Sequence, residues 1–400
     1  MFFMYTHLTL AIYFIYFCLG LIGIGIVSLF ILKFNHLHKV KKNQQYLQKH
    51  QDYFKFIQTH LNGPSELPLP PGKLKELEGR VIQEKLIGWI EQFKGEYREK
   101  LVKLCHDAGF VRKDIKLLDS LFYGRRIASA YRLGGMRAAE AVPRLLTMMK
   151  NERYTPLTIV VARAVAKSAE NEEQLKEMLQ HLLRHGKPIH NMAADIVMET
   201  QLDASRLLLK LLDDENPDLV KVALVAMWGQ AIPEVVPSLD RLVGAEQTDV
   251  RAEAVKLYLS SNPVLKDDTI KKLMADKDWE VRAAVAKSLG SLHAAGSIPL
   301  LRNALKDANW WVRNNSAESL AKLGETGFEV LCQIAMNGSG VERETAMYHI
   351  ERAMLQDNEH QKLDQMVAYN KKKLLYERYF GVAERRPVRQ VAAVGGDYTA

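Results

Sequence analysis

The chain has 400 residues, of which 48% are hydrophobic and 26% charged, a composition typical of a folded protein and not of a disordered one. Its net charge is +8, but residues 33–60 carry +5 and residues 371–400 carry +4, which leaves −1 for residues 61–370. A nucleic-acid-binding array is expected to carry a basic face, so this distribution argues against nucleic acid as a partner.

An uncharged stretch near the N-terminus, residues 8–32, is long enough to cross a membrane. As a helix it would be about 37 Å long, against about 30 Å for the hydrocarbon core of a bilayer. The alternative is a cleaved signal peptide, but no Lys or Arg precedes Leu8 and no Ala-x-Ala site follows the stretch. We therefore predict a transmembrane helix at residues 8–32.

Basic residues follow this stretch and none precede it: Lys33, Lys39, Lys41 and Lys42. By the positive-inside rule, residues 33–400 lie on the cytoplasmic side of a plasma membrane and residues 1–7 on its outer side. The same lysines are expected to contact the membrane surface.

Residues 33–61 are predicted to continue as a basic juxtamembrane helix. Apolar residues recur in it every seven positions, at Val40, Leu47, Phe54 and Leu61. The companion heptad positions are mostly Gln, so a coiled coil would be weak, and we favour an amphipathic helix lying on lipid headgroups. Residues 62–72 hold four prolines and are predicted to form a semi-rigid linker.

Residues 73–118 follow a helical period and are predicted to form an N-terminal cap for the array described below. The adjacent Cys105, His106 and Asp107 invite a catalytic interpretation. Neighbours in sequence point in different directions on a helix, so we expect a buried or half-buried cysteine instead. Cys18 and Cys332 lie far away in sequence, which excludes a Cys-x-x-Cys metal site and suits a reducing compartment.

The following residues repeat at a fixed period. The pair Val281-Arg282 returns 31 residues later at Val312-Arg313, and it also occurs 31 residues earlier at Val250-Arg251. A fixed period of this length is typical of a stacked repeat array. Matching segments extend the predicted array over residues 119–368, in about eight units.

Each unit is predicted to be a pair of antiparallel helices. The first helix begins at a proline such as Pro299, which the first turn of a helix tolerates. The second helix carries the Val-Arg pair and small residues, such as Ala284 and Ala286, that let neighbouring helices approach closely. Gly290 or Gly324 is then expected to end the second helix as a C-cap.

One set of residues carries a family resemblance: Asp278, Val281, Arg282, Ala283, Ala284, Ala286, Leu289, Gly290, Ala294, Ala295, Ile298, Pro299, Leu300 and Leu301. The pattern resembles the HEAT-repeat family, in the short bacterial form called phycobilisome-lyase-like HEAT repeats. The resemblance covers residues 119–368 and is strongest at 276–324. It implies an all-α, right-handed α-solenoid whose second helices line the concave face, and it implies binding without naming a ligand.

Arg251, Arg282 and Arg313 occupy equivalent positions in successive units. They could form a basic ladder for a phosphate or an acidic partner. In repeats of this family the arginine typically binds the turn carboxylate, here Asp249 or Asp278, and ties one unit to the next. We favour that structural role, which suits the forked guanidinium.

Two tryptophans, Trp279 and Trp310, are also equivalent, and Trp311 is adjacent. Tryptophan is enriched at the energetic centres of protein interfaces, so these three residues are our candidate protein-binding site. The alternative is that they cover the ends of neighbouring helices. Trp228 lies within a predicted second helix and is expected in the core.

Enzymatic interpretations find little support. Deoxyhypusine hydroxylases with HEAT-like repeats hold iron with His-Glu pairs, but none of the twelve histidines here precedes Glu. Phycobilisome lyases share the repeat, but nothing here marks a bilin site. No phosphate loop, nucleophile elbow or zinc spacing occurs. We predict no catalytic residue, cofactor or metal, with a lyase-like or modifying enzyme that uses the repeat groove as the alternative.

Residues 369–380 are predicted to be a last basic helix and residues 381–400 a disordered tail that contacts anionic lipid. The whole pattern predicts a single-pass membrane protein whose cytoplasmic solenoid acts as a scaffold or adaptor. It would hold a protein partner at the inner face of a bacterial plasma membrane. A membrane enzyme is one such partner, by family analogy alone.

Overall fold

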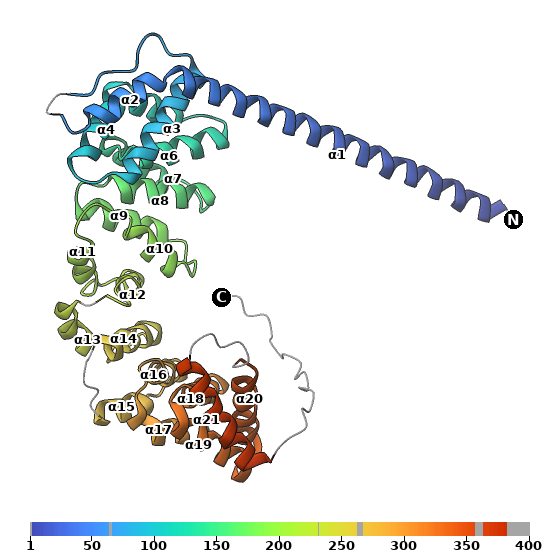
Figure 1. Cartoon of the computed structure of the whole chain (residues 1–400), viewed down its shortest axis with the longest axis vertical. Helices are drawn as coiled ribbons and strands as arrows, with labels where there is room; N and C mark the ends of the chain where they lie inside the picture. The colour runs from blue at the N-terminus through green and yellow to red at the C-terminus, as the bar shows by residue number, and fades with distance from the viewer. Residues whose placement is uncertain (1, 64–65, 231, 262–266, 357–362, 382–400) are drawn as a thin grey trace. The chain divides into compact units, whose positions relative to one another are not determined.

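The computed structural model describes residues 2–63, 66–230, 232–261, 267–356 and 363–381. The secondary structure within those ranges is helical, which confirms the predicted all-α class. The chain divides into two compact units, Met1–Glu170 and Asn171–Ala400 (Figure 1).

The first unit runs from α1 to α8. Its helices are α1 (Phe2–Lys49), α2 (Gln51–His60), α3 (Glu76–Gln92), α4 (Glu96–Asp107), α5 (Phe110–Leu117), α6 (Tyr123–Gly135), the 3-10 turn η1 (Ala139–Ala141), α7 (Val142–Asn151) and α8 (Pro156–Ser168).

Helix α1 is long and apolar enough to cross a membrane, judged by its length and composition. The stretch Tyr13–Lys49 contains a window with a mean hydropathy of 2.6, and no residue of that window is buried against the rest of the protein. Lys33, Lys39, Lys41 and Lys42 lie directly after the apolar part and are exposed. We call residues 33–42, which hold these lysines, the basic collar. It follows the apolar part of α1 on one continuous helix.

Contacts with the buried Glu78 fix the end of α1 to α3. The side chains of Lys49 and His50 each donate to Glu78, at 2.7 Å in both cases. These two hydrogen bonds lower the pKa of Glu78 to about 2, against the opposing effect of burial. Glu78 is buried and charged, and burying an unpaired carboxylate would cost free energy. Its two hydrogen-bond partners offset that cost.

Helix α2 packs on the cap. This differs from the expectation that residues 33–61 lie on lipid headgroups, since helical geometry is interrupted at His50 and the helix that follows has buried apolar residues. Ile57 is fully buried and Phe54 makes an edge-to-face contact with Trp89, with ring centroids 5.8 Å apart. Residues 50–61 thus belong to the folded cap, because their apolar side chains find partners there.

The second unit runs from α9 to α21. Its helices are α9 (Glu172–Leu183), α10 (His190–Val197), α11 (Ala204–Leu211), α12 (Pro217–Ala226), the 3-10 turn η2 (Pro233–Val235), α13 (Val236–Leu242), α14 (Thr248–Ser261), α15 (Asp267–Met274), α16 (Trp279–Ser291), the 3-10 turn η3 (Ala295–Ser297), α17 (Ile298–Ala304), α18 (Trp310–Lys322), α19 (Gly324–Asn337), α20 (Gly340–Gln356) and α21 (Leu363–Phe380). Of the predicted tail at 381–400, residues 382–400 lie outside the described residues.

Helical hairpins build both units, as the repeat period predicts. In the first unit the pairs are α5–α6 and α7–α8, and in the second they run from α9–α10 to α19–α20. Pro143, Pro237 and Pro299 each stand in the first turn of a first helix, directly after a 3-10 turn. The prediction that a proline starts these helices is therefore confirmed for α7, α13 and α17.

Second helices of successive hairpins approach very closely. Ser319 of α18 donates to the carbonyl of Ala286 in α16 at 2.7 Å, and Asn315 donates to the carbonyl of Ala283 at 3.0 Å. A Cβ added to Gly290 would stand 2.7 Å from the Cα of Ser319. The small residues of α16 thus set the spacing between two repeats, as predicted for its alanine-rich face.

The expectation that Gly290 caps its helix is wrong, because α16 continues to Ser291 and Gly290 is buried inside it. The C-terminal cap of α16 lies three residues after Gly290, where His293 has φ 52° and the N–H of Ala294 donates to Leu289 O at 3.0 Å. Arg137 (φ 52°) ends α6 in the same way. Gly324 does have a positive φ, 71°, just after α18.

We expect Gly290→Ala to destabilise the second unit, because the added methyl group overlaps backbone atoms of α18 that cannot rotate away. The cost of such overpacking is about 1–3 kcal/mol. Gly296→Ala is the matched control, since open space surrounds that position and its cost should stay within about 0.5 kcal/mol. Urea unfolding followed by circular dichroism measures both. Equal midpoints for the two variants would contradict the close approach.

Candidate functional site

The starts of α14 and α16 are each held by an arginine that joins two successive turns. Arg282 donates to both carboxylate oxygens of Asp307, at 2.8 and 2.9 Å, and to the carbonyl of Asp276 at 2.8 Å. The carbonyl belongs to the turn before its own helix and the carboxylate to the turn before α18. One planar guanidinium therefore bridges two repeats by a bidentate charge-assisted pair.

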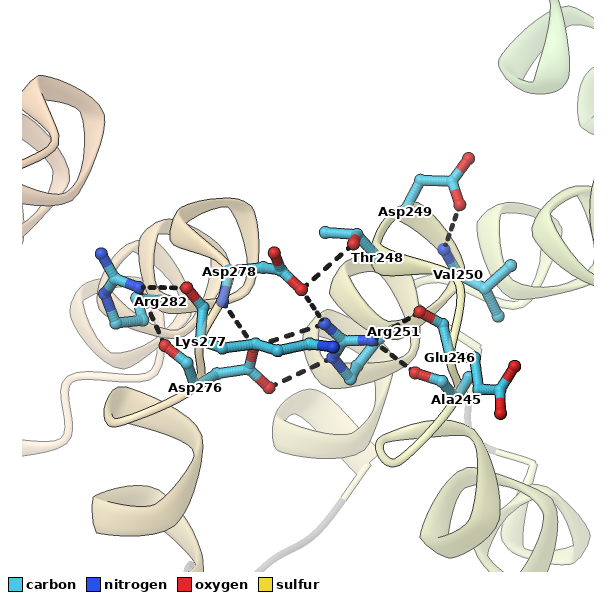
Figure 2. Close-up of polar contacts among 10 residues, drawn as sticks. All are labelled: Ala245, Glu246, Thr248, Asp249, Val250, Arg251, Asp276, Lys277, Asp278 and Arg282. Carbon is cyan, nitrogen blue, oxygen red and sulfur yellow. Dashed lines mark hydrogen bonds and ion pairs between the residues drawn. The ribbon is translucent and has the colours of Figure 1, made fainter.

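Arg251 repeats this arrangement one unit earlier, as Figure 2 shows. It donates to Asp276 at 3.1 Å, to Asp278, and to the carbonyls of Ala245 and Glu246. The pairing with Asp278 is one of the two predicted from the resemblance. For Arg282 the carboxylate is that of Asp307, 25 residues on, which is equivalent to Asp276, 25 residues after Arg251.

The remaining two residues of this set differ from expectation. Asp249 is bound by Lys221 at 2.7 Å and not by an arginine. Arg313 donates to the carbonyls of Asp307 and Ala308, both at 2.8 Å, while its Nε finds no acceptor among the described residues. The position equivalent to Asp307 in the next repeat is Gly338, so the series of carboxylate ties ends there.

The pairing changes the proton affinity of the carboxylate. Partial burial alone would raise the pKa of Asp307, but hydrogen bonds from Arg282 and from the N–H of Asn309 lower it below its usual value. The pKa of Arg282 is raised by its hydrogen bonds to Asp307, which oppose the effect of burial. Both groups stay charged at neutral pH, which suits a structural tie and leaves little capacity for a phosphate.

Three tryptophans stand at the first turn of the helices that these arginines hold. Trp279 is the first residue of α16, and Trp310 and Trp311 are the first two of α18. Their exposed fractions are 36%, 51% and 52%. The rings of Trp310 and Trp311 meet edge to face with centroids 4.7 Å apart. Large apolar rings that remain exposed in this way fit a contact surface better than a core.

The repeat position of Trp279 and Trp310 is apolar once more in α20. The sequence-based candidate site does not include this residue. Val341, 31 residues after Trp310, lies in the first turn of α20 and is exposed, and Tyr348 is exposed two turns further along that helix. Extending the 31-residue period would have found Val341. We call Trp279, Trp310, Trp311, Val341 and Tyr348 the aromatic surface.

Trp228 is the reverse case. It was predicted to lie in the core, but it is 68% exposed, because α12 ends at Ala226 and Trp228 falls in the turn that follows. It lies at a different repeat position from Trp279 and Trp310.

The cysteine near the candidate catalytic cluster is inaccessible. Cys105 is fully buried in α4, and burial raises the pKa of its thiol to about 12. The expectation of a buried cysteine is confirmed. A neutral, enclosed thiol is a poor nucleophile. Within the ranges that the structure describes, no three His, Cys, Asp or Glu side chains stand close enough to hold a metal ion.

We expect Arg282→Gln to cost about 2–4 kcal/mol of unfolding free energy, since it leaves Asp307 largely buried without its cation. Arg302→Gln, at an exposed position of α17, is the control and should change stability by less than about 0.5 kcal/mol.

The difference in unfolding free energy between wild type and Arg282→Gln should depend on pH. The folded-state pKa of Asp307 is lowered, so its contribution is complete above the unfolded pKa, about 4, and is lost as the pH falls through the folded value. Urea unfolding at neutral pH and at successively lower pH values measures the loss. A difference that stays constant down to pH 2 would contradict the ion pair.

Comparison with known proteins identifies the repeats. Residues 267–348, which span α15 to α19 and part of α20, match the HEAT-repeat family. A search of curated protein sequences found no match.

Solved structures that resemble the chain include three of different kinds. The CpcE–CpcF complex of phycocyanin lyase from Nostoc is 18% identical, with 61% of this chain and 94% of that chain covered and a TM-score of 0.29. An engineered protein is 16% identical, with coverage of 82% and 99% and a TM-score of 0.30. Kap95p in complex with RanGDP is 12% identical, with coverage of 80% and 54% and a TM-score of 0.37. The family match shows HEAT repeats over residues 267–348, and further helical hairpins lie on both sides of that segment.

Proposed function

We propose that the chain is a membrane-anchored scaffold that binds another protein at the inner face of a bacterial plasma membrane. The observation that carries this proposal is the aromatic surface. Trp279, Trp310 and Val341 recur at one repeat position on three successive second helices and remain exposed. Repeated apolar residues on stacked helices supply a preorganised surface, which lowers the entropic cost of binding.

The arginine ties support this role because they hold the surface rigid. Arg282 joins the turn before α16 to the turn before α18, and those two helices start with Trp279 and Trp310. A binding partner would therefore meet tryptophans whose backbone positions are already fixed. Tryptophan in such a setting is often a hot spot worth about 2 kcal/mol or more.

The anchor rests on α1 and on its connection to the cap. No described side chain in the apolar part of α1 is buried, and this part runs without a break into the basic collar. The contacts of Lys49 and His50 with the buried Glu78 join the end of that helix to α3. In our proposal the membrane helix is thus connected to the folded cap by a short, ordered junction.

Replacing the three tryptophans tests the binding surface. Trp279→Ala, Trp310→Ala and Trp311→Ala together should reduce recovery of the partner about tenfold or more when the tagged full chain is solubilised from its native membranes. Trp228→Ala is the matched control, because it removes an exposed tryptophan of the same unit that lies elsewhere. Unchanged recovery of the partner, with a lowered unfolding midpoint, would show that the three tryptophans have a structural role.

A second experiment tests the anchor. Ile22→Lys and Ile24→Lys introduce two charges into the apolar part of α1, each costing about 2.5–3.5 kcal/mol at the centre of a membrane helix. We expect the double variant to leave the membrane pellet on alkaline extraction, whereas Leu37→Lys, in the basic collar, should stay in it.

Topology is measured on the wild-type chain in the same cells. Protease added to spheroplasts should spare residues 33–400, and digestion of the repeats from outside would contradict the proposed orientation.

A further inference from the structure

The last helix of the second unit, α21, has two different faces. One face packs on α19, which lies beside it (Figure 1). Leu375 is buried in the core of the unit, Tyr379 donates to Glu329 at 3.1 Å, and the ammonium of Lys372 lies 6.0 Å from the ring centroid of Phe328. These contacts fix the rotation of α21 about its own axis.

The opposite face of α21 carries an apolar row that stays exposed among the described residues. Its large hydrophobic side chains are between 49% and 75% exposed: Leu363, Met366, Val367 and Leu374. Leu363, Val367 and Leu374 are spaced at i, i+4 and i+11, which places them in one row along a helix. An uncovered apolar row of this kind is unfavourable in water and indicates a binding surface.

Cations border this row on both sides. At 100° per residue, Lys371 and Lys373 project about 80° to either side of the line through Leu363. Both ammonium groups are more than half exposed, and their carboxylate neighbours, Glu325 at 3.4 Å and Glu377 at 4.0 Å, form loose surface pairs. Surface pairs of this kind contribute about 1 kcal/mol or less, so the lysines remain available to another anion.

The charge of the segment points to the class of ligand. Residues 371–400 carry a net charge of +4, including Arg385, Arg386 and Arg389 beyond the described helix. The stretch after the apolar part of α1, residues 33–60, carries +5, while the rest of the chain between them is nearly neutral. An apolar row between lysines is the pattern of a helix that lies in the plane of a membrane interface. Anionic headgroups attract such lysines by about 1 kcal/mol each.

We propose that α21 is a second membrane contact, an interfacial helix whose Leu363–Leu374 row inserts at the surface of an anionic bilayer. Lys371 and Lys373 bind the lipid headgroups on either side of the row. The inference rests on the proposed membrane location of the chain. It gives the array two attachment points, one at each end of the sequence.

A fluorescent label on the row tests the contact in the full-length chain. Cys18→Ser removes the accessible native cysteine, since Cys105 and Cys332 are buried, and Val367→Cys receives an environment-sensitive nitrobenzoxadiazole label. The labelled chain is reconstituted into vesicles of phosphatidylcholine with or without phosphatidylglycerol. We expect a blue shift and at least a twofold rise in emission in the anionic vesicles alone. A label at Lys277→Cys, in an exposed turn, should not respond.

Charge reversal separates lipid binding from other contacts. Lys371→Glu with Lys373→Glu should abolish the response of the label at position 367. Equal emission in the two kinds of vesicle, or a response that follows protein concentration and so reports a second copy, would overturn the proposal. Alkaline extraction of the same vesicles reports on α1 independently, so the anchor and the α21 contact can each fail alone.

Discussion

The structure depends on one contact, the arginine that bridges two successive turns. Arg282 donates to the carbonyl of the turn before its own helix and to Asp307 in the next turn, so it fixes the distance between two repeats. Gly290 and Ala286 permit the close helix approach that this distance requires. The same turns begin the helices that start with Trp279 and Trp310. The tie that stacks the repeats therefore also positions the exposed aromatic surface.

Much of this fold follows from periodicity. The 31-residue return of Val281-Arg282 predicts the hairpins, and proline predicts where α7, α13 and α17 begin. Spacing does not say which turn lies across from Arg282, so Asp307 was missed as its partner. Nor does it separate a capping glycine from a packing one, because both stand at the end of an apolar helical pattern in the sequence. Gly290 proved to be the second kind, and His293 adopts the left-handed cap.

The candidate site shows the same limits. The equivalent repeat positions of Trp279 and Trp310 led to two rings that are exposed. The prediction for Trp228 was wrong because α12 ends two residues before it, which leaves its side chain in an exposed turn. The two faces of α21 and the burial of α2 on the cap are tertiary features, since they depend on which neighbour covers each apolar row. We propose that a rigid array carries its partner surface in the repeats and its membrane contacts in α1 and α21.

The central claim is that the aromatic surface binds a protein partner at the membrane. It is tested most directly by replacing Trp310 with a photoreactive benzoylphenylalanine in the full-length chain and irradiating intact cells. The account predicts one discrete crosslinked product of higher mass from position 310, and none from the same replacement at the exposed Trp228. Absence of a product from position 310, or the same product from both positions, would contradict it.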